Sequence, residues 1–461
     1  MQAKINGNIS FWYADIGGIP TPGGPLPGDM EADVAIVGAG YTGLWTAYYL
    51  KQADPSLRVV LLEKEFAGFG ASGRNGGWLS GGFSWSREKY LAASSRQAVV
   101  SMQNAMAGTV DEVISVAERE NIDADILRVD NLTVATNAAQ WERVKAMYAE
   151  ALEWDTPATK VELLDAKAAR ARINIHNIQG AKVVHGTARV QPAKLVRGLA
   201  EAVRRAGAEI YEQTTVTGIE KGRVTTDRGT VRAPIIIRAT EGFTAGLPGQ
   251  KRNWLPLNSA QIVTEPLSDA LWEEIGWKGH ELLGDAAHAY CYAQRTREGR
   301  ITMGGRGVPY RFNSKTDVRG QTQQATIDQL HAILLRLLPQ TRDLRIDHAW
   351  CGVLGVPRDW CTTVGFDQRS GMGWAGGYVG LGVSTSNLSG RTLCDLVLGR
   401  DTELVRLPWV NRAVRQWEPE PLRWLGVHSM YQLYNLADRR EEGGLQHSSR
   451  LATLADKLTG H

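Results

Sequence analysis

A glycine-rich turn near the start of the chain has the residue types and spacing of a dinucleotide-binding site. Gly38, Gly40 and Gly43 form a GxGxxG pattern directly after the short apolar run 33–37. The first glycine makes the turn, the second lets a pyrophosphate approach the backbone, and the third lets helix and strand pack together. Phosphate then lies at the helix N-terminus, where unpaired N–H groups favour negative charge. Glu63, at the end of the next apolar run, is placed to accept hydrogen bonds from ribose hydroxyls.

The glycine pattern alone does not distinguish FAD from NAD, because both cofactors use this turn. Residues 63–77 resemble the second signature of the D-amino-acid-oxidase-like FAD-dependent oxidoreductases, the family of glycine oxidase and sarcosine oxidase. Further matches follow in the family's order at 190–192, 236–240 and 376–383. The strings ASGRNGG (71–77), GGRGVPYRF (304–312) and GVPRDW (355–360) are most similar to the γ-glutamylputrescine oxidoreductase branch.

This resemblance implies that FAD binds to residues gathered from several separate segments. The loop 70–73 would bring its backbone and the Ser72 hydroxyl to the pyrophosphate and the flavin edge, and Arg74 would add a fixed positive charge. The amides of 377–382 and a helix that starts near Ser384 to Ser386 would face the pyrimidine side of the flavin and stabilise negative charge there. The complete expected set is Gly38, Gly40, Tyr41, Thr42, Gly43, Glu63, Lys64, Gly70, Ala71, Ser72, Arg74, Asn75, Gly76, Gly77, Val216, Ala239, Thr240, Cys351, Gly377, Gly380, Leu381, Gly382, Val383 and Ser384.

The chemistry implied by the family is transfer of a hydride to flavin N5 from the carbon next to an amine nitrogen, after which water hydrolyses the imine. The protein then has to orient the C–H bond and exclude bulk water, and a dedicated base is not required. We therefore interpret His288, His331 and His348 as structural histidines. The side chains expected around the reacting atoms are Arg74, Trp78, Arg306, Trp350 and Tyr378, with Tyr292 and Trp360 as further cavity-lining candidates.

Three positions depart from relatives within the family. Glycine oxidase and D-amino acid oxidase carry an arginine for the substrate carboxylate where this chain has Leu354, so a simple α-amino acid is disfavoured as substrate. Thr302 and Arg306 occupy the places of a lysine and a histidine of sarcosine oxidase, which leaves O2 or another electron acceptor open. Cys351 falls near the cysteine that sarcosine oxidase bonds to its flavin; we expect a buried free thiol and noncovalent FAD, with a covalent link as the alternative.

Several functions remain open on the sequence alone. We favour FAD-dependent oxidation of a C–N bond in a primary or secondary amine of the γ-glutamylputrescine oxidoreductase type. One alternative substrate is an N-methyl or other amino acid. A hydroxylase that uses NAD(P)H, or a flavin-containing assembly or sensor protein without activity, are further alternatives. Consumption of NAD(P)H would distinguish the hydroxylase from the amine oxidoreductase.

The hydrophobic patterns predict the elements that position these residues. Apolar runs at 33–37, 58–62 and 235–239 are typical of buried parallel strands, and the apolar periodicity at 99–117 and the segment 192–207 indicate amphipathic helices. We predict an α/β fold in which a Rossmann-like FAD-binding domain is interleaved with an α+β substrate domain built on a mixed or antiparallel sheet. The predicted parts are an N-terminal strap (1–30), the FAD-binding domain (31–95, 180–250 and 360–400), the substrate domain (96–179 and 251–359) and a helical tail (401–461).

The overall composition limits the possible partners. Lys and Arg number 52 against 49 Asp and Glu, and this balance gives little support for a nucleic acid groove or an anionic membrane surface. The four cysteines lack the spacing of a zinc site or a disulfide framework, and we predict no metal. The chain has no apolar stretch long enough for a membrane span or signal peptide, so we expect a cytoplasmic enzyme, a monomer or homodimer, that acts on a small amine.

Overall fold

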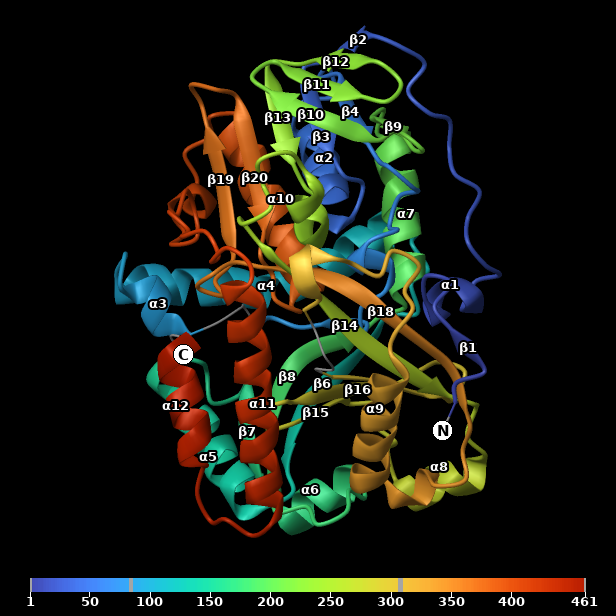
Figure 1. Cartoon of the computed structure of the whole chain (residues 1–461), viewed down its shortest axis with the longest axis vertical. Helices are drawn as coiled ribbons and strands as arrows, with labels where there is room; N and C mark the ends of the chain where they lie inside the picture. Colours follow the sequence, from blue (N-terminus) through green and yellow to red (C-terminus); the bar gives the residue numbers. More distant parts are fainter. Residues whose placement is uncertain (1, 83–85, 306–309, 460–461) are drawn as a thin grey trace.

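The computed structural model describes residues 2–82, 86–305 and 310–459. Figure 1 shows two interleaved halves, with a parallel sheet and its helices in the upper part and a large mixed sheet in the lower part. The chain passes between the halves several times, so neither half is made from one continuous segment.

The upper half is built on a six-stranded sheet in which all strands but the edge strand β19 run parallel. In spatial order the strands are β19 (Thr363–Asp367), β20 (Met372–Gly376), β13 (Ile235–Arg238), β3 (Val34–Val37), β4 (Val59–Leu62) and β9 (Glu209–Tyr211). All four residues of β3 and of β4 are buried, as expected for strands covered on both faces. Val37 is paired with both Leu62 and Arg238, so the carboxyl ends of three strands meet at one edge.

Helices and a small sheet cover the two faces of this parallel sheet. On one face lie α2 (Tyr41–Ala53), α10 (Gly382–Val397), α7 (Pro192–Arg205) and α4 (Arg96–Arg119), which share one apolar core. On the other face packs a four-stranded sheet formed by β10 (Val216–Glu220), β11 (Arg223–Thr226), β12 (Thr230–Arg232) and β2 (Met30–Glu31). The three layers confirm the predicted Rossmann-like half.

The lower half is a ten-stranded mixed sheet. Its strands are, in order, β1 (Ile5–Asn6), β18 (Ile346–Val356), β14 (Leu255–Thr264), β17 (Ile301–Gly305), β16 (Cys291–Arg295), β15 (Leu282–Asp285), β6 (Leu127–Ala135), β8 (Gly180–Arg189) and β5 (Trp78–Leu79), with β7 (Val161–Asp165) paired to β8. The helices attached to it are α5 (Ala138–Glu153), α6 (Ala166–Arg172), α8 (Asp269–Ile275) and α9 (Gln324–Leu337). The predicted fold class is therefore confirmed for both halves.

Three segments belong to a different half from the one predicted. The helix α4 was assigned to the substrate domain, but its apolar face packs on α10 and shares a core with α2. The strands β8 and β5 were assigned to the FAD-binding domain, but β8 pairs with β6, β7 and β5 in the large sheet. These errors have the same cause, because an apolar segment is known to be buried without a sign of which neighbour covers it.

The C-terminal region is helical only in part. After a short 3-10 turn the chain is irregular through residue 421, and then α11 (Leu422–Glu442) and α12 (Arg450–Thr459) pack against each other. Figure 1 shows both helices at the lower left, near α5 and the open side of the large sheet. A further short helix, α3 (Arg87–Leu91), packs on α4.

The N-terminal segment is fastened to the loop at 68–75. β1 pairs with β18 in parallel, and α1 (Phe11–Asp15) follows it. Ser10 donates a hydrogen bond to the carbonyl of Gly73 at 2.8 Å, and the indole of Trp12 donates one to the carbonyl of Asn75 at 2.7 Å. Within the predicted strap, residues 5–15 contain β1 and α1 and are tied to a loop that was expected to contact the cofactor, and the chain is irregular from there to β2.

None of the helices within residues 2–82, 86–305 and 310–459 has both the length and the apolar character that a membrane span needs.

Candidate functional site

Two cavities meet between the halves of the molecule. The first has a volume of about 450 Å³ and starts at the carboxyl ends of β3, β4 and β13. The second, of about 580 Å³, lies over one face of the large sheet. Both are lined by Ala71, Asn75, Leu354, Gly380 and Val383, so these five residues form the junction between them.

The glycine turn forms one end of the first cavity. Gly38 has φ +103°, a conformation that side chains other than glycine rarely adopt, and a Cβ there would lie 2.6 Å from the carbonyl oxygen of Ala239. Ser72 Oγ accepts a hydrogen bond from the amide of Tyr41 at 2.8 Å. Within the described residues no hydrogen bond uses the amides of Gly40, Thr42 and Gly43. The N-terminus of α2 therefore offers donors for an anionic group, as a pyrophosphate requires.

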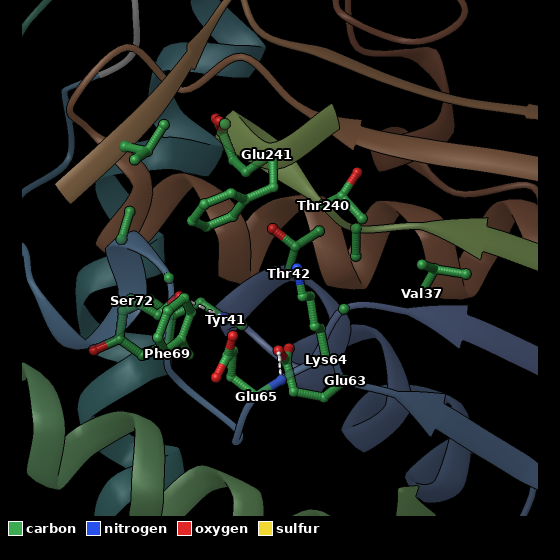
Figure 2. Close-up of a pocket in the computed structure, with 18 of the residues that line it drawn as sticks. Val37, Tyr41, Thr42, Glu63, Lys64, Glu65, Phe69, Ser72, Thr240 and Glu241 are labelled. Carbon is green, nitrogen blue, oxygen red and sulfur yellow. Dashed lines mark hydrogen bonds between the residues drawn. The ribbon is translucent and has the colours of Figure 1, made fainter. Parts of the chain in front are cut away.

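Glu63 is held rigidly beside this turn. Its carboxylate accepts hydrogen bonds from the amides of Ala39 at 2.9 Å and Glu65 at 3.0 Å. Burial raises the pKa of Glu63, while these two N–H groups act in the opposite direction. Figure 2 shows the carboxylates of Glu63 and Glu65 at the cavity next to Lys64. A carboxylate has further acceptor positions, so Glu63 can still accept hydrogen bonds from the hydroxyls of a ribose.

Tyr378 and Glu241 organise the opposite end of the first cavity. The hydroxyl of Tyr378 lies 2.7 Å from that of Thr42, which joins the 377–382 loop to α2. The carboxylate of Glu241 accepts hydrogen bonds from the amides of Gly377 at 3.0 Å and Tyr378 at 3.1 Å, and a third from Gly355. Burial raises the pKa of Glu241 to about 7 against the effect of these amides. Glu241 thus fixes the loop that was expected to cover the flavin.

The sequence interpretation missed Glu241, although a signal was present. The residue comes shortly after the apolar run 235–239, and the carboxyl ends of strands in an open parallel sheet are where ligands bind. An acidic side chain at that edge is therefore a candidate site residue. The helix α10 begins at Gly382, before the predicted start at 384–386.

Most of the residues expected to bind FAD come together around the first cavity. Those that line it are Gly38, Gly40, Tyr41, Thr42, Glu63, Lys64, Gly70, Ala71, Ser72, Asn75, Val216, Ala239, Thr240, Gly380, Gly382 and Val383. Arg74, Gly76 and Leu381 line the second cavity instead. The remaining five residues line neither cavity, so the structure gives no support for their direct contact with FAD: Gly43, Gly77, Cys351, Gly377 and Ser384. The role of the first group in FAD binding stays a prediction.

Arg74 was expected to place a fixed positive charge beside the flavin or an anionic substrate group, but backbone carbonyls surround its guanidinium. Nε donates to the carbonyl of Phe69 and Nη2 to that of Val318, both at 2.8 Å, and Nη1 points to the carbonyls of Asp317 and Cys351 at 3.4 Å. The guanidinium also lies over the ring of Phe69. Because its donors are used by backbone carbonyls, Arg74 joins its own loop to the segment at 317–318 and to β18, and it is not available to bind a substrate carboxylate.

Trp350 is another predicted catalytic residue that the structure places elsewhere. Its indole is fully buried in an aromatic cluster with Phe11 and Trp12, and its N–H donates to the carbonyl of Arg74 at 2.9 Å. It lines neither cavity. Trp350 lies on the same face of β18 as Gly352 and Leu354, which line the second cavity, but the N-terminal segment covers its end of the strand. Arg306 lies outside the described residues.

The covalent alternative at Cys351 is not supported by the geometry. The Cys351 thiol donates to the carbonyl of Gln321 at 3.3 Å and lines neither cavity. Burial raises its pKa to about 12, with Asp317 adding to the effect. A thiol that stays protonated is a poor nucleophile, so Cys351 is a structural thiol.

The second cavity has mainly apolar walls and an aromatic side. Trp78, Tyr292 and Trp360, all expected to line a substrate cavity, do so. The rings of Trp78 and Tyr292 meet edge to face with their centroids 6.1 Å apart. Leu354 lies at the junction of the two cavities, so the position at which relatives were expected to carry a substrate-binding arginine is apolar here.

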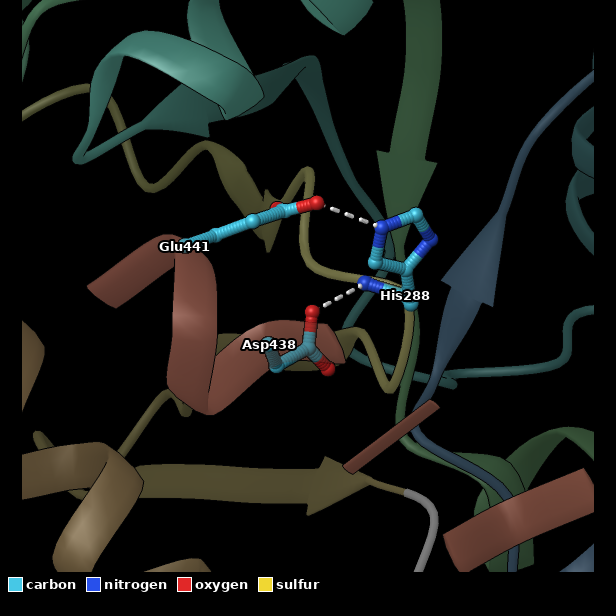
Figure 3. A group of neighbouring side chains, drawn as sticks. All are labelled: His288, Asp438 and Glu441. Atoms are coloured by element: carbon cyan, nitrogen blue, oxygen red, sulfur yellow. Dashed lines mark hydrogen bonds and ion pairs between the residues drawn. The ribbon is translucent and has the colours of Figure 1, made fainter. Parts of the chain in front are cut away.

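A cluster of His288, Asp438 and Glu441 lies outside both cavities and has the donor types of a metal site (Figure 3). Both oxygens of Asp438 accept backbone amides, from His288 at 2.8 Å and Ala289 at 2.9 Å. Glu441 is paired with Arg143 at 2.7 Å and with His288 at 2.9 Å. The arginine supplies the positive charge that a metal would bring, so we interpret the cluster as the attachment of α11 to α5 and the large sheet.

Comparisons with known proteins agree with this geometry. A family profile described as "DAO: FAD dependent oxidoreductase" matches residues 33–396. The chain is 30% identical over 401 residues to the gamma-glutamylputrescine oxidoreductase of Escherichia coli (strain K12), covering 85% of this chain and 89% of that one. It is also 30% identical over 419 residues to the probable oxidoreductase OrdL of Rhizobium meliloti (strain 1021), covering 87% and 91%. The crystal structure of glycine oxidase from Geobacillus kaustophilus superposes with a TM-score of 0.67 at 21% identity, covering 83% of this chain and 99% of that one.

Proposed function

The chain belongs to the DAO family of FAD-dependent oxidoreductases, and from this premise we propose that it oxidises a carbon–nitrogen bond in a primary or secondary amine. The observation that carries the proposal is the junction of the two cavities at Ala71, Asn75, Leu354, Gly380 and Val383. A cofactor that fills the first cavity would meet there a substrate that fills the second.

The residues of the first cavity fit FAD. The uncapped amides at the start of α2 suit a pyrophosphate, and the fixed carboxylate of Glu63 suits the ribose hydroxyls. The 377–382 loop, held by Glu241, would lie against the ring system with the start of α10. When bound, FAD accepts a hydride from the carbon next to the amine nitrogen.

The residues of the second cavity would orient the substrate and exclude water. Trp78, Tyr292 and Trp360 provide apolar surface near the junction, against which the carbon chain of an amine can pack. An apolar environment disfavours the ammonium form and so favours the neutral amine that the reaction needs. Water that enters afterwards hydrolyses the imine product to an aldehyde, with release of ammonia from a primary amine or of a smaller amine from a secondary one.

Leu354 supports an amine over a simple α-amino acid. A carboxylate next to the oxidised carbon would have to lie at the junction, where this leucine offers no positive charge. The donors of Arg74 are already used by backbone carbonyls, so that side chain does not replace the missing arginine. Burial of an unpaired carboxylate there would be costly.

An anaerobic spectral screen tests the proposal. Purified protein loaded with FAD is mixed with amines, acylated polyamines and α-amino acids, and loss of the flavin absorption band reports oxidation. We expect bleaching by amines and acylated polyamines and little by α-amino acids. Bleaching only by α-amino acids, or only by NAD(P)H, would refute it. Readmission of O2 or addition of a quinone after bleaching identifies the electron acceptor.

A further inference from the structure

The second cavity has one polar end, distant from the junction, which the proposed oxidation does not use. Lys182 in β8 and Asn131 and Thr133 in β6 line this end. Within the described part of the chain, none of these three side chains makes a hydrogen bond or an ion pair. All three residues are only partly buried, so water can reach them in the free protein, and together they present an ammonium, an amide and a hydroxyl as unused donors to a ligand in the cavity.

The strand register shows how this polar end is connected to the junction. Lys182 lies directly opposite Thr133, Thr133 opposite Gly284, and Gly284 opposite Tyr292. Residues paired in this way point to the same face of a sheet. Gly284 has no side chain, and the Trp78 ring, 3.3 Å from where a Cβ would lie, covers this position between the polar end and Tyr292. The three strand spacings from Lys182 to Tyr292 correspond to roughly 14 Å.

The charges around Lys182 leave its ammonium uncompensated. Glu150 is paired with Arg87 at 2.7 Å, and the buried Asp285 is paired with Arg336 at 3.2 Å. Burial lowers the pKa of Lys182, with Arg87 acting in the same direction and Glu150 in the opposite one. An anionic ligand at this position would remove the cost of the unpaired charge.

We propose that Lys182, with Asn131 and Thr133, forms a subsite for a carboxylate carried by the substrate on the side away from the oxidised carbon. The substrate class would then be an amine with an acidic group at the far end of a chain, on the order of 10 Å from the reacting carbon. This substrate class rests on the proposed amine oxidation, but the carboxylate subsite itself can be tested by ligand binding alone.

The binding test uses two ligands that lack the oxidisable amine. N-Butylglutaramate carries a terminal carboxylate, and N-butylpentanamide has a methyl group in its place. Calorimetric titration of the FAD-loaded protein should give a preference for the acid of roughly 10- to 100-fold, the usual effect of a hydrogen bond to a charged group. Lys182→Met should abolish this preference, and Lys182→Arg should retain most of it.

A matched control separates the subsite from a general charge effect. Lys145 lies on the neighbouring helix α5, is exposed and is paired with Glu142, so Lys145→Met should preserve the preference. Equal affinities for the two ligands in the parent protein, or a preference that survives in Lys182→Met, would overturn the proposal. Bleaching by N-glutarylputrescine and N-pentanoylputrescine is measured in parallel. If neither bleaches the flavin while the acid still binds through Lys182, the amine oxidation fails and the subsite stands.

Discussion

Replacement of Gly43 by alanine should disturb both the fold and the cofactor site. Gly43 is the third glycine of the turn and lies in the first turn of α2, against the carbonyl of Gly38 at the end of β3. An added Cβ would lie 2.0 Å from this carbonyl oxygen and 3.2 Å from Cγ2 of Ile36. The obstacle is backbone, which a change of rotamer cannot relieve.

The size of the effect follows from these distances. An ordinary contact begins near 3.4 Å, so the helix would have to move away from β3 by more than 1 Å. Overpacking of this kind lowers the free energy of unfolding by about 1–3 kcal/mol, and we expect the upper end because both neighbours belong to the central strand. The same shift moves the amides of Gly40 and Thr42, which should weaken FAD binding by roughly 10- to 100-fold.

A second helical glycine provides the control. Gly108 lies in α4, is exposed, and would place a Cβ with no atom within 4 Å. Gly108→Ala should therefore raise stability by up to about 1 kcal/mol through helix propensity alone. Urea unfolding of the apoprotein and titration with FAD, followed by quenching of flavin fluorescence, measure the two quantities. If Gly43→Ala has the same urea midpoint as the parent and a dissociation constant for FAD within twofold of the parent's, the close approach of α2 to β3 is wrong.

Three further perturbations have defined outcomes. Tyr378→Phe removes the hydrogen bond to Thr42, and we expect the dissociation constant for FAD to rise about fivefold, as for the loss of about 1 kcal/mol; an unchanged constant would contradict this role. Acid precipitation should release the yellow cofactor into the supernatant from both the parent and Cys351→Ala, because the thiol lines neither cavity; colour retained in the parent's pellet and lost in the variant would show a covalent link. Burial opposes ionisation of Glu441, but hydrogen bonds from His288 and Arg143 lower its pKa to about 2. The stabilisation from this carboxylate is therefore complete above about pH 4.3 and lost as pH falls toward 2. The urea midpoint of the parent should decrease over that range more steeply than that of Glu441→Gln, and parallel curves would exclude the ion pair as its cause.

Local signals in the sequence predicted the elements of the nucleotide-binding half accurately. The apolar runs 33–37 and 58–62 correspond to β3 and β4, and the helix expected from Pro192 is α7, which ends at Arg205 just before Gly207. These elements depend on short-range features such as continuous apolar runs, a proline at the first helical position and a glycine after the last. The order of parallel strands then brought the glycine turn and Glu63 to one edge, as predicted.

The errors concern contacts between segments that are distant in the sequence. Arg74 was predicted to face the flavin because it lies in a glycine loop, but its guanidinium is held by carbonyls near residue 318. Trp350 and Cys351 are neighbours in β18, and the sequence does not show that Phe11 and Trp12 cover the first or that the thiol of the second bonds to the carbonyl of Gln321. Glu241 was missed because its function depends on amides contributed by Gly377 and Tyr378, more than 130 positions along the chain.

The attachment of residues 5–15 has a consequence for how the protein is made. Ile5 is paired with His348, so this segment leaves the ribosome long before its strand partner has been made. Contacts of such high sequence separation form late, because closing a long loop is slow. The hydrogen bonds from Ser10 and Trp12 to the loop that carries Ser72 would form at the same late stage. Uptake of the cofactor by newly made protein should accordingly be one of the final events of maturation, and a fusion partner joined ahead of Ile5 would delay it more than one joined after α12.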